Sequence, residues 1–232
     1  MSPVDCTLLV MAKAPVSGQA KTRLAPAFGA DGAAEIAAAA LLDTLDAVGL
    51  TDVTNHVVAL SGDLDLASGG TGIARVLEDF VVVPQYGATF SDRLVRAHGD
   101  AARLGCPVLQ IGMDTPQVVG DLLTRSAEML LGEGVDAVLG PAADGGWWAL
   151  GLSDPAAASV LTDIPMSRDD TGILTRAALV DRGCLITELP VLTDVDTPED
   201  ARVVAAAMSP ASRFRRTVEA LDTRSRTPRS FR

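Results

Sequence analysis

The stretches Leu8–Ala12 (LLVMA) and Phe80–Pro84 (FVVVP) are apolar at every position. Strands that are apolar throughout are typical of a parallel sheet buried on both faces, whereas half-exposed strands alternate apolar and polar residues. Seven short, strand-like runs alternate with Ala- and Leu-rich helical segments along the chain. This alternation predicts an α/β fold, a three-layer sandwich in which a mostly parallel, open sheet lies between two layers of helices.

The pattern also gives bounds for the individual elements. The expected strands are Cys6–Ala12, Asn55–Leu60, Asp79–Pro84, Pro107–Gly112, Asp136–Gly140, Trp147–Leu152 and Cys184–Leu189. The expected helices are Gly32–Val48, Ser91–Leu104, Pro116–Leu131, Thr171–Asp181 and Pro198–Met208. The segment Asp63–Gly72 is expected to be a turn-rich connection. Because no linker or internal repeat interrupts this order, we expect one domain over residues 1–210 and a basic, Arg-rich tail over residues 211–232.

Composition narrows the class of protein. The 232 residues are 48% hydrophobic, which is enough to build a core and excludes a wholly disordered chain. We expect no membrane span and a cytoplasmic location, because no apolar run is long enough to cross a bilayer and the first residues lack the basic region of a secretory signal. The three cysteines form no CxxC pair, so any bound metal is expected to be a hard cation with oxygen ligands.

The charge is unevenly distributed along the chain. The net charge is −11, yet the segment Arg213–Arg232 carries seven arginines against Glu219 and Asp222. An acidic body repels nucleic acid, and a basic tail that contains Ser, Thr and Pro is most often a solvated appendage. We therefore expect small-molecule partners and no nucleic acid; no sequence feature indicates an oligomeric state.

The loop after the first strand carries a functional signal, because ligands of open α/β sheets bind beyond the carboxyl ends of the strands. Residues 13–26 have the sequence KAPVSGQAKTRLAP. Small residues let backbone N–H groups approach phosphate oxygens, and the three cations neutralise phosphate charge. The loop lacks the GxxxxGK[ST] spacing of a Walker A motif, and a flexible surface loop is the alternative. We interpret it as a nucleotide-phosphate site formed by Ala12, Lys13, Gly18, Lys21 and Arg23.

A carboxylate follows the fourth strand. Asp114, in the stretch 111–116 (IGMDTP), stands where one of its oxygens can bind Mg²⁺ or Mn²⁺. In the alternative interpretation, Thr115 is a helix N-cap and Pro116 is the first helical residue, which needs no catalytic role. That alternative leaves Asp114 unexplained.

Two further carboxylates follow the last strand, in the stretch 194–200 (DVDTPED). Asp194 and Asp196 share one side of an extended segment, and a bound cation would relieve their repulsion. Thr197 and Asp200 form a capping box with Asp in place of Glu. We take Asp196 as the second candidate metal ligand.

The stretch 140–148 (GPAADGGWW) joins two strands. Its Asp-Gly-Gly sequence is suited to a tight turn, so a simple hairpin is one interpretation. In the other, Gly145 and Gly146 let a substrate approach the backbone and Asp144 accepts hydrogen bonds from its hydroxyls. Trp147 would then pack on a sugar or base, although such a Trp is more often part of the core.

Two arginines give weaker signals. Arg93, near the start of the helix expected from Ser91, either caps that helix or binds a phosphate of the nucleotide. Arg168 follows the segment Ile164–Ser167, where it could meet an anionic group of an acceptor or be exposed to solvent.

Together, these stretches resemble the GT-A superfamily of nucleotide-diphospho-sugar transferases, with the resemblance extending over about residues 5–208. The interval between GMDTP and DGGWWALGL is its most specific part. The chain is most similar to a bacterial branch of small proteins assigned as glycosyltransferases and associated with arsenosugar biosynthesis. The 2-phospholactate guanylyltransferases are a related branch with a similar opening loop.

The resemblance implies a GT-A fold and a transferase with Mg²⁺ or Mn²⁺ as cofactor. Lys21 and Arg23 would lie in the nucleotide-phosphate loop, while Asp114 and Asp196 would match metal ligands. Residues Asp144, Gly145 and Gly146 would match the acceptor- or sugar-side motif, so that Asp114 and Asp144 are the candidate catalytic residues.

Three functions are compatible with these residues. The first is metal-dependent glycosyl transfer from a nucleotide-diphospho-sugar to a small-molecule acceptor. The second is nucleotidyl transfer, in which a nucleoside triphosphate is joined to a phosphorylated acceptor. The third is nucleotide or sugar binding without turnover.

Overall fold

The computed structural model describes residues 2–226 and contains one seven-stranded sheet, with strand order β3-β2-β1-β4-β6-β5-β7. The strands are β1 (Val4–Lys13), β2 (Val53–Ser61), β3 (Val81–Pro84), β4 (Val108–Gly112), β5 (Ala137–Pro141), β6 (Trp147–Leu152) and β7 (Ile186–Glu188). Strand β6 runs antiparallel to β4 and β5, and the other neighbouring pairs are parallel. All seven expected strands are confirmed.

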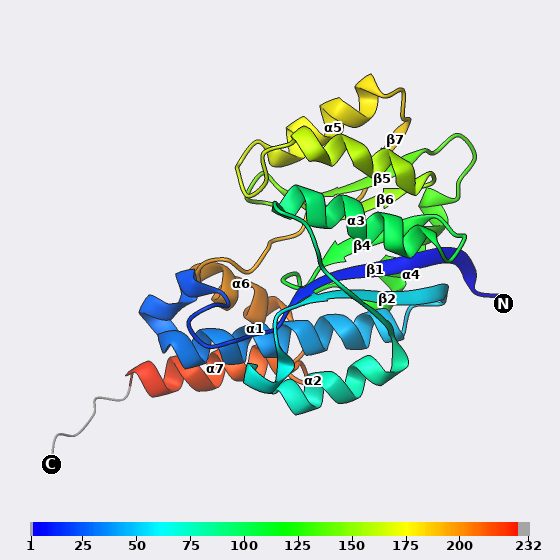
Figure 1. Ribbon diagram of the computed structural model, residues 1–232. Helices are drawn as coiled ribbons and strands as arrows, with labels where there is room; N and C mark the ends of the chain where they lie inside the picture. The colour runs from blue at the N-terminus through cyan, green and yellow to red at the C-terminus, as the bar shows by residue number, and fades with distance from the viewer. Residues whose placement is uncertain (1, 227–232) are drawn as a thin grey trace, which may run out of the picture.

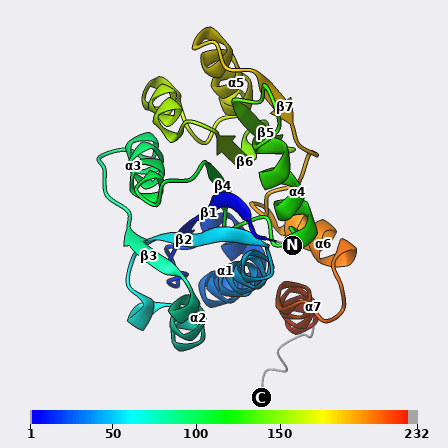
Figure 2. The same cartoon turned by 90° about the vertical axis from the view of Figure 1, so that its right-hand side faces the viewer.

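Helices cover both faces of the sheet, which confirms the predicted three-layer α/β sandwich (Figure 1). One face packs against α1 (Ala25–Gly49), α2 (Gly70–Val76) and α4 (Gly120–Leu130). The other packs against α3 (Phe90–Ala102), the 3-10 helix Pro155–Asp163 and α5 (Thr171–Asp181). The view in Figure 2 shows the two layers on either side of the strands.

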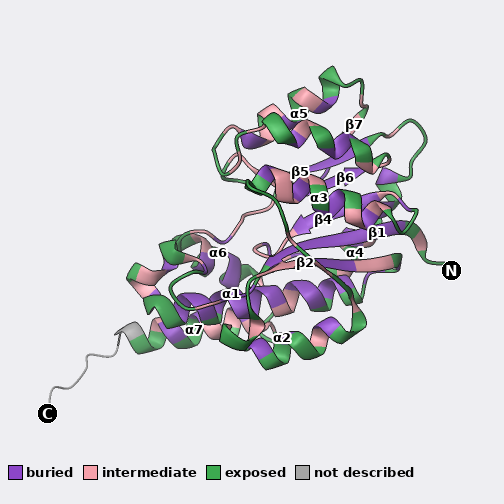
Figure 3. Ribbon diagram, viewed as in Figure 1, coloured by how far each residue is buried: buried purple, intermediate pink, exposed green. Residues whose placement is uncertain are grey.

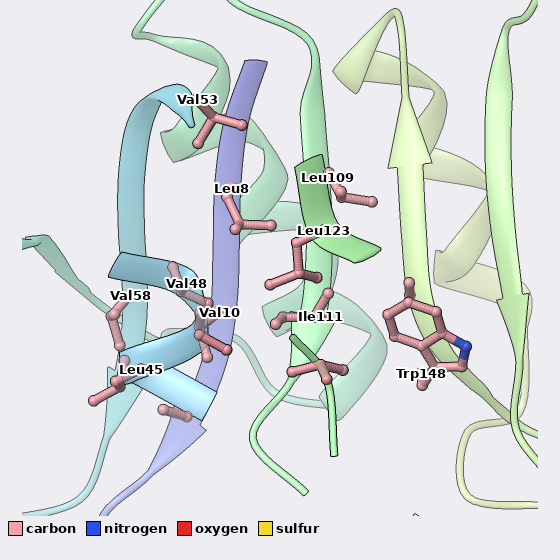
Figure 4. Close-up of a cluster of buried hydrophobic side chains, with 14 of the residues drawn as sticks. Leu8, Val10, Leu45, Val48, Val53, Val58, Leu109, Ile111, Leu123 and Trp148 are labelled. Carbon is pink, nitrogen blue, oxygen red and sulfur yellow. The ribbon is translucent and has the colours of Figure 1, made fainter. Parts of the chain in front are cut away.

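The continuous apolar strands explain why both faces are covered. In β1, Leu8 and Val10 point toward α1 and α4, whereas Leu9 and Met11 point toward α3. Successive side chains of a strand alternate between faces, so a strand without polar residues needs a helical layer on each side. Figure 3 shows the resulting buried central strands. Figure 4 shows the core cluster to which α1 contributes, and Trp148 belongs to the same cluster.

The Arg-rich segment that follows residue 210 contains a helix that packs on the core. Helix α7 (Arg213–Arg226) packs with α6 (Pro198–Ala207) against α1, and Phe214 is fully buried between them. The carboxylate of Asp43 on α1 accepts hydrogen bonds from Ser212 Oγ at 2.7 Å and from the Phe214 backbone N–H at 3.0 Å. The interpretation of this segment as a solvated appendage is therefore wrong for residues 213–224, while residues 227–232 lie outside the described part.

Two local expectations are corrected by the structure. The N-cap role of Thr115 is wrong, because α4 begins at Gly120 and residues 115–118 form a turn closed by the Val118 N–H and the Thr115 carbonyl at 3.1 Å. The helix begins at a close approach to the end of α1, because a Cβ at Gly120 would lie 3.2 Å from the carbonyl oxygen of Leu50. The turn-rich connection Asp63–Gly72 contains the first residues of α2.

One helical stretch of the described residues, Thr22–Gly49, is long and apolar enough to cross a membrane by length and composition. It is the helix that lies across the sheet, and its side chains Ala38, Leu41 and Leu45 contribute to the main core. Its apolar character is accounted for by packing within the fold.

Candidate active site

A cleft of about 630 Å³ is lined by residues at the carboxyl ends of the parallel strands. These strands end on the left-hand side of Figure 1. This is where ligands of open α/β sheets bind. It brings together most of the predicted site residues: Ala12, Lys13, Arg23, Arg93, Asp114, Asp144, Gly146, Trp147 and Asp196. Three others, Gly18, Lys21 and Gly145, do not line it among the described residues.

Lys21 lies directly behind the cleft and joins the two predicted metal ligands. Its ammonium donates to Asp114 Oδ2 at 2.8 Å and to Asp196 Oδ1 at 2.7 Å. Burial alone would lower the pKa of Lys21, but the two carboxylates outweigh it and hold that pKa above its ordinary value. The backbone of Lys21 is left-handed, with φ 44°, an uncommon conformation for a residue with a side chain. Lys21 therefore fixes the carboxylates and adds no exposed positive charge.

Arg23 completes this network on the solvent side. Its guanidinium donates to Asp196 Oδ2 at 3.2 Å, so both oxygens of Asp196 are occupied. Burial raises the pKa of Asp196, but the charge and hydrogen bond of Lys21 and the charge of Arg23 together outweigh it, and the net pKa is lowered. Asp196 is thus held as a carboxylate that accepts from two cations.

The position of Asp114 depends on a glycine two residues earlier. A Cβ at Gly112 would lie 2.7 Å from Asp114 Oδ1, so the carboxylate fills the space that a side chain at 112 would need. The carbonyl of Asp114 also accepts a hydrogen bond from the Val195 N–H at 2.9 Å. This bond ties the end of β4 to the segment that carries Asp194 and Asp196.

Asp194 is the member of the acidic pair that faces the other cleft carboxylates. Its Oδ1 is buried and has no hydrogen-bond partner among the described residues. Burial, followed by the charges of Asp114 and Asp144, raises the pKa of Asp194 to about 8. The Asp-Val-Asp alternation predicts Asp196 as the metal ligand, but spacing does not tell which of the two carboxylates pairs with Lys21.

The Asp-Gly-Gly turn joins β5 to β6 as an antiparallel hairpin. Asp144 Oδ1 accepts the Gly146 N–H at 2.9 Å, and Asp144 lines the cleft. Gly145 has φ 91°, and a Cβ there would lie 1.9 Å from the carbonyl oxygen of Asp169. Gly145 is therefore required for the turn and its close approach to the segment before α5, while Asp144 and Gly146 face the cleft.

The two tryptophans after this turn have different places. Trp148 is 1% exposed, and its indole N–H donates to the Pro190 carbonyl at 2.8 Å, so it belongs to the core. Trp147 is half-buried and lines the cleft, and its indole Nε1 has no partner among the described residues.

Two amide side chains in the cleft have no counterpart in the sequence-based site. Gln85 donates through Nε2 to the carbonyls of Ala12 and Ala59, at 2.7 Å each, and its amide oxygen has no hydrogen-bond partner within residues 2–226. Gln110 on β4 is joined to His98 at 3.2 Å between Oε1 and Nε2. Burial lowers the pKa of His98 to about 4, so its ring is neutral at pH 7. Neither Gln belongs to a motif, and only the fold places them in the cleft.

The cleft carboxylates offer donor atoms that suit Mg²⁺ or Mn²⁺. No three His, Cys, Asp or Glu side chains within residues 2–226 are gathered closely enough to form a preformed metal cage. The unpartnered Oδ1 of Asp194 and the raised pKa of its carboxyl nevertheless indicate uncompensated negative charge beside Asp114. Oxygen donors of this kind fit a hard divalent cation.

The fold is that of nucleotide-diphospho-sugar transferases and nucleotidyltransferases. A Desulfovibrio desulfuricans G20 structure, named provisionally as a nucleotide-diphospho-sugar transferase, has a TM-score of 0.81 at 24% identity, covering 97% of this chain and 99% of that one. A cytidylyltransferase from Leptospira borgpetersenii has a TM-score of 0.56 at 13% identity, covering 95% of both chains. Rv0371c of Mycobacterium tuberculosis H37Rv, in complex with manganese, has a TM-score of 0.55 at 20% identity, covering 88% and 100%.

The family of the chain is also shown. The model of the family described as "Uncharacterized protein conserved in bacteria (DUF2064)" matches residues 44–168, more than half of the chain, and the protein belongs to this family. No curated protein matches it. The more specific links to arsenosugar biosynthesis and to guanylyl transfer stay predictions.

Proposed function

We propose that the protein is a metal-dependent glycosyltransferase that uses a nucleotide-diphospho-sugar donor in the cleft. The observation that carries this proposal is the meeting, in one cleft, of cations from the loop after β1 with carboxylates that follow β4 and β7. A cationic contact and a divalent ion both stabilise the negative charge of a departing diphosphate. The fold supports the same class of ligand.

On the donor side, Lys13 and Arg23 contact the phosphates. Both line the cleft, and the ammonium of Lys13 bonds only the Gln19 carbonyl, at 3.1 Å, among the described residues. Lys21 acts through the carboxylates it holds. Gln85 presents an amide oxygen that suits an N–H group of the base.

On the metal side, Asp114 and Asp194 hold the cation. Asp194 has the unpartnered buried oxygen, whereas both oxygens of Asp196 bind Lys21 and Arg23. We therefore assign Asp196 to positioning Lys21 and Arg23, in place of the direct metal-ligand role expected from the sequence. When bound, a divalent ion supplies charge neutralisation of the departing nucleoside diphosphate.

Asp144 orients the acceptor. Its carboxylate lines the cleft at the hairpin turn, with Oδ1 fixed by the Gly146 N–H, so Oδ2 can accept a hydrogen bond from an acceptor hydroxyl. The same carboxylate can take the proton of that hydroxyl during transfer.

Nucleotidyl transfer is the second candidate, and one observation favours it. Carboxylates from two separate segments, Asp114 after β4 and Asp194 after β7, face each other, and such a pair suits a reaction in which an acceptor attacks the α-phosphorus of a triphosphate. Nucleotidyltransferases share the fold.

Product analysis separates these functions. Purified protein with Mn²⁺ is incubated with nucleotide-sugars or with nucleoside triphosphates, each with a panel of acceptors. Release of nucleoside diphosphate together with a glycosylated acceptor supports glycosyl transfer, and release of pyrophosphate supports nucleotidyl transfer. Binding without turnover in every combination contradicts both and favours a non-catalytic binding protein. The cytoplasmic location of the protein stays a prediction.

A further inference from the structure

Arg93 differs from the other arginines of the cleft. Arg23 is paired with Asp196 and Arg168 with Asp170, but Arg93 has no carboxylate partner among residues 2–226. Its Nε donates weakly to the Thr89 carbonyl at 3.4 Å, and its guanidinium carbon lies 5.8 Å from the centre of the Phe90 ring. Its positive charge is therefore uncompensated on a protein with a net charge of −11.

The wall around Arg93 is held in a defined shape. The start of α3 is joined to the loop before α5 by the Ser91 hydroxyl, which donates to the Ile164 carbonyl at 3.1 Å. Thr171 closes this loop by donating to the Pro165 carbonyl at 2.8 Å and accepting the Arg168 N–H at 3.1 Å. Ser167, in the middle of the loop, has a left-handed backbone with φ 61°. A pre-shaped wall of this kind lowers the entropic cost of binding.

A second polar group of this wall also lacks a partner. The indole Nε1 of Trp147 is buried and unpaired in the described residues, while the Trp147 side chain lines the cleft together with Met166. An unpaired buried donor costs free energy unless a ligand accepts its hydrogen bond. Trp147 thus adds an apolar surface, beside Met166, to the positive charge of Arg93.

Arg93 and the carboxylates of the cleft come from different parts of the fold. Asp114 and Asp194, the residues that we propose hold the metal, follow β4 and β7 and line the cleft. Arg93 comes from α3, in the layer that covers the opposite face of the sheet. The unpaired guanidinium of Arg93 therefore offers an anionic group a positive charge that is separate from the paired cations Lys21 and Arg23.

We propose that Arg93, with Trp147 and Met166, forms an acceptor subsite for a small organic acid whose carboxylate or phosphate group pairs with the Arg93 guanidinium. This inference rests on the proposed function and specifies the acceptor of that site. It reassigns Arg93 from the nucleotide to the acceptor. Guanidinium donors suit either anion, and the Trp147 and Met166 side chains cover the apolar part of the acceptor.

The test compares Arg93→Gln with Arg96→Gln, a matched variant on the same helix. Arg96 lies over the Tyr86 ring, with its guanidinium carbon 5.0 Å from the centre, and does not line the cleft. Calorimetric titration measures the affinity of the anion site. The anionic probes are malate and glycerol 3-phosphate, and glycerol is the neutral probe. A panel of nucleoside diphosphates with Mn²⁺ measures the donor site in the same samples.

We expect Arg93→Gln to weaken the preferred anion about tenfold or more, with Arg96→Gln within about twofold of wild type. Nucleoside diphosphate affinity should stay unchanged in both variants. Malate and glycerol 3-phosphate distinguish a carboxylate from a phosphate acceptor. Equal anion affinity in wild type and Arg93→Gln overturns the proposal, and so does a matching loss of nucleotide affinity, which returns Arg93 to the donor. If no nucleotide binds while the Arg93-dependent anion site persists, the proposed function fails and the anion site stands.

Discussion

Replacement of Lys21 by Met tests whether this ammonium holds the two cleft carboxylates together. The Met side chain keeps the length and apolar stem of Lys but removes the donor to Asp114 and Asp196. Lys21 is 14% exposed at its side chain, and the carboxylates are 34% and 36% exposed. The variant therefore leaves two close carboxylates without their shared cation, although Arg23 still contacts Asp196.

The loss of stability expected for Lys21→Met depends on how exposed Lys21 and its two carboxylate partners are. Breaking a fully buried pair from one side costs about 3–5 kcal/mol, whereas an exposed pair contributes at most about 1 kcal/mol. Because one partner is buried and the other two are about one-third exposed, we expect a loss of about 2 kcal/mol in the free energy of unfolding. For a chain of this size, that loss corresponds to a fall of about 4–8 °C in Tm.

Urea unfolding at pH 7 measures this loss, with Lys13→Met as the matched control. Lys13 bonds only a carbonyl through its side chain in the described residues, so its variant should stay within about 0.5 kcal/mol of wild type. The double variant Lys21→Met/Asp114→Asn should recover part of the stability, because Asp114 loses its cation in Lys21→Met whereas Asp196 keeps Arg23. A Lys21→Met protein as stable as the Lys13→Met control would refute the bridging role.

Two further predictions concern the core. His98 has a pKa of about 4 because it is buried, so between pH 6.5 and 4 the unfolded chain binds a proton that the folded protein does not. Stability should fall over this range by about 3 kcal/mol more in wild type than in His98→Gln, as measured by urea unfolding at each pH, with the half-buried His56→Gln as control. Identical pH profiles for wild type and His98→Gln would contradict this. Phe214→Ala should lose about 3–5 kcal/mol because α7 is part of the core, whereas the exposed Arg216→Gln should change little; similar values for both would contradict the packing of α7.

The sheet could be predicted from the sequence because its signal is local. The unbroken apolar runs Leu8–Ala12 and Phe80–Pro84 predict strands whose two faces are both buried. The structure places these runs in the parallel strands β1 and β3. The start of α4 could not be predicted in this way. The helix begins at Gly120, where the chain closely approaches the carbonyl of Leu50, and a contact with a residue so distant in sequence leaves no local signal.

The position of the site could be predicted from the sequence, but the ion pairs among its charged side chains could not. Asp114, Asp144 and Asp196 follow strands, so the topology alone brings them to one cleft. That Lys21 binds Asp196, leaving Asp194 with an unpartnered oxygen, depends on the left-handed backbone of Lys21 and on tertiary distances. Helix α7 was not predicted because the seven arginines of the segment Arg213–Arg232 indicate a solvated tail. The three buried residues Phe214, Val218 and Leu221 are a weaker signal than this charge.

Thermal unfolding with nucleoside diphosphates tests the central claim most directly. Wild type, Asp114→Asn and the exposed control Asp121→Asn, in the first turn of α4, are each measured with a panel of nucleoside diphosphates in the presence and absence of Mn²⁺. We predict that at least one nucleotide raises the Tm of wild type and Asp121→Asn only when Mn²⁺ is present, and that Asp114→Asn loses this shift. No Mn²⁺-dependent shift with any nucleotide, or an equal shift in Asp114→Asn, would contradict a metal-assisted nucleotide site in the cleft.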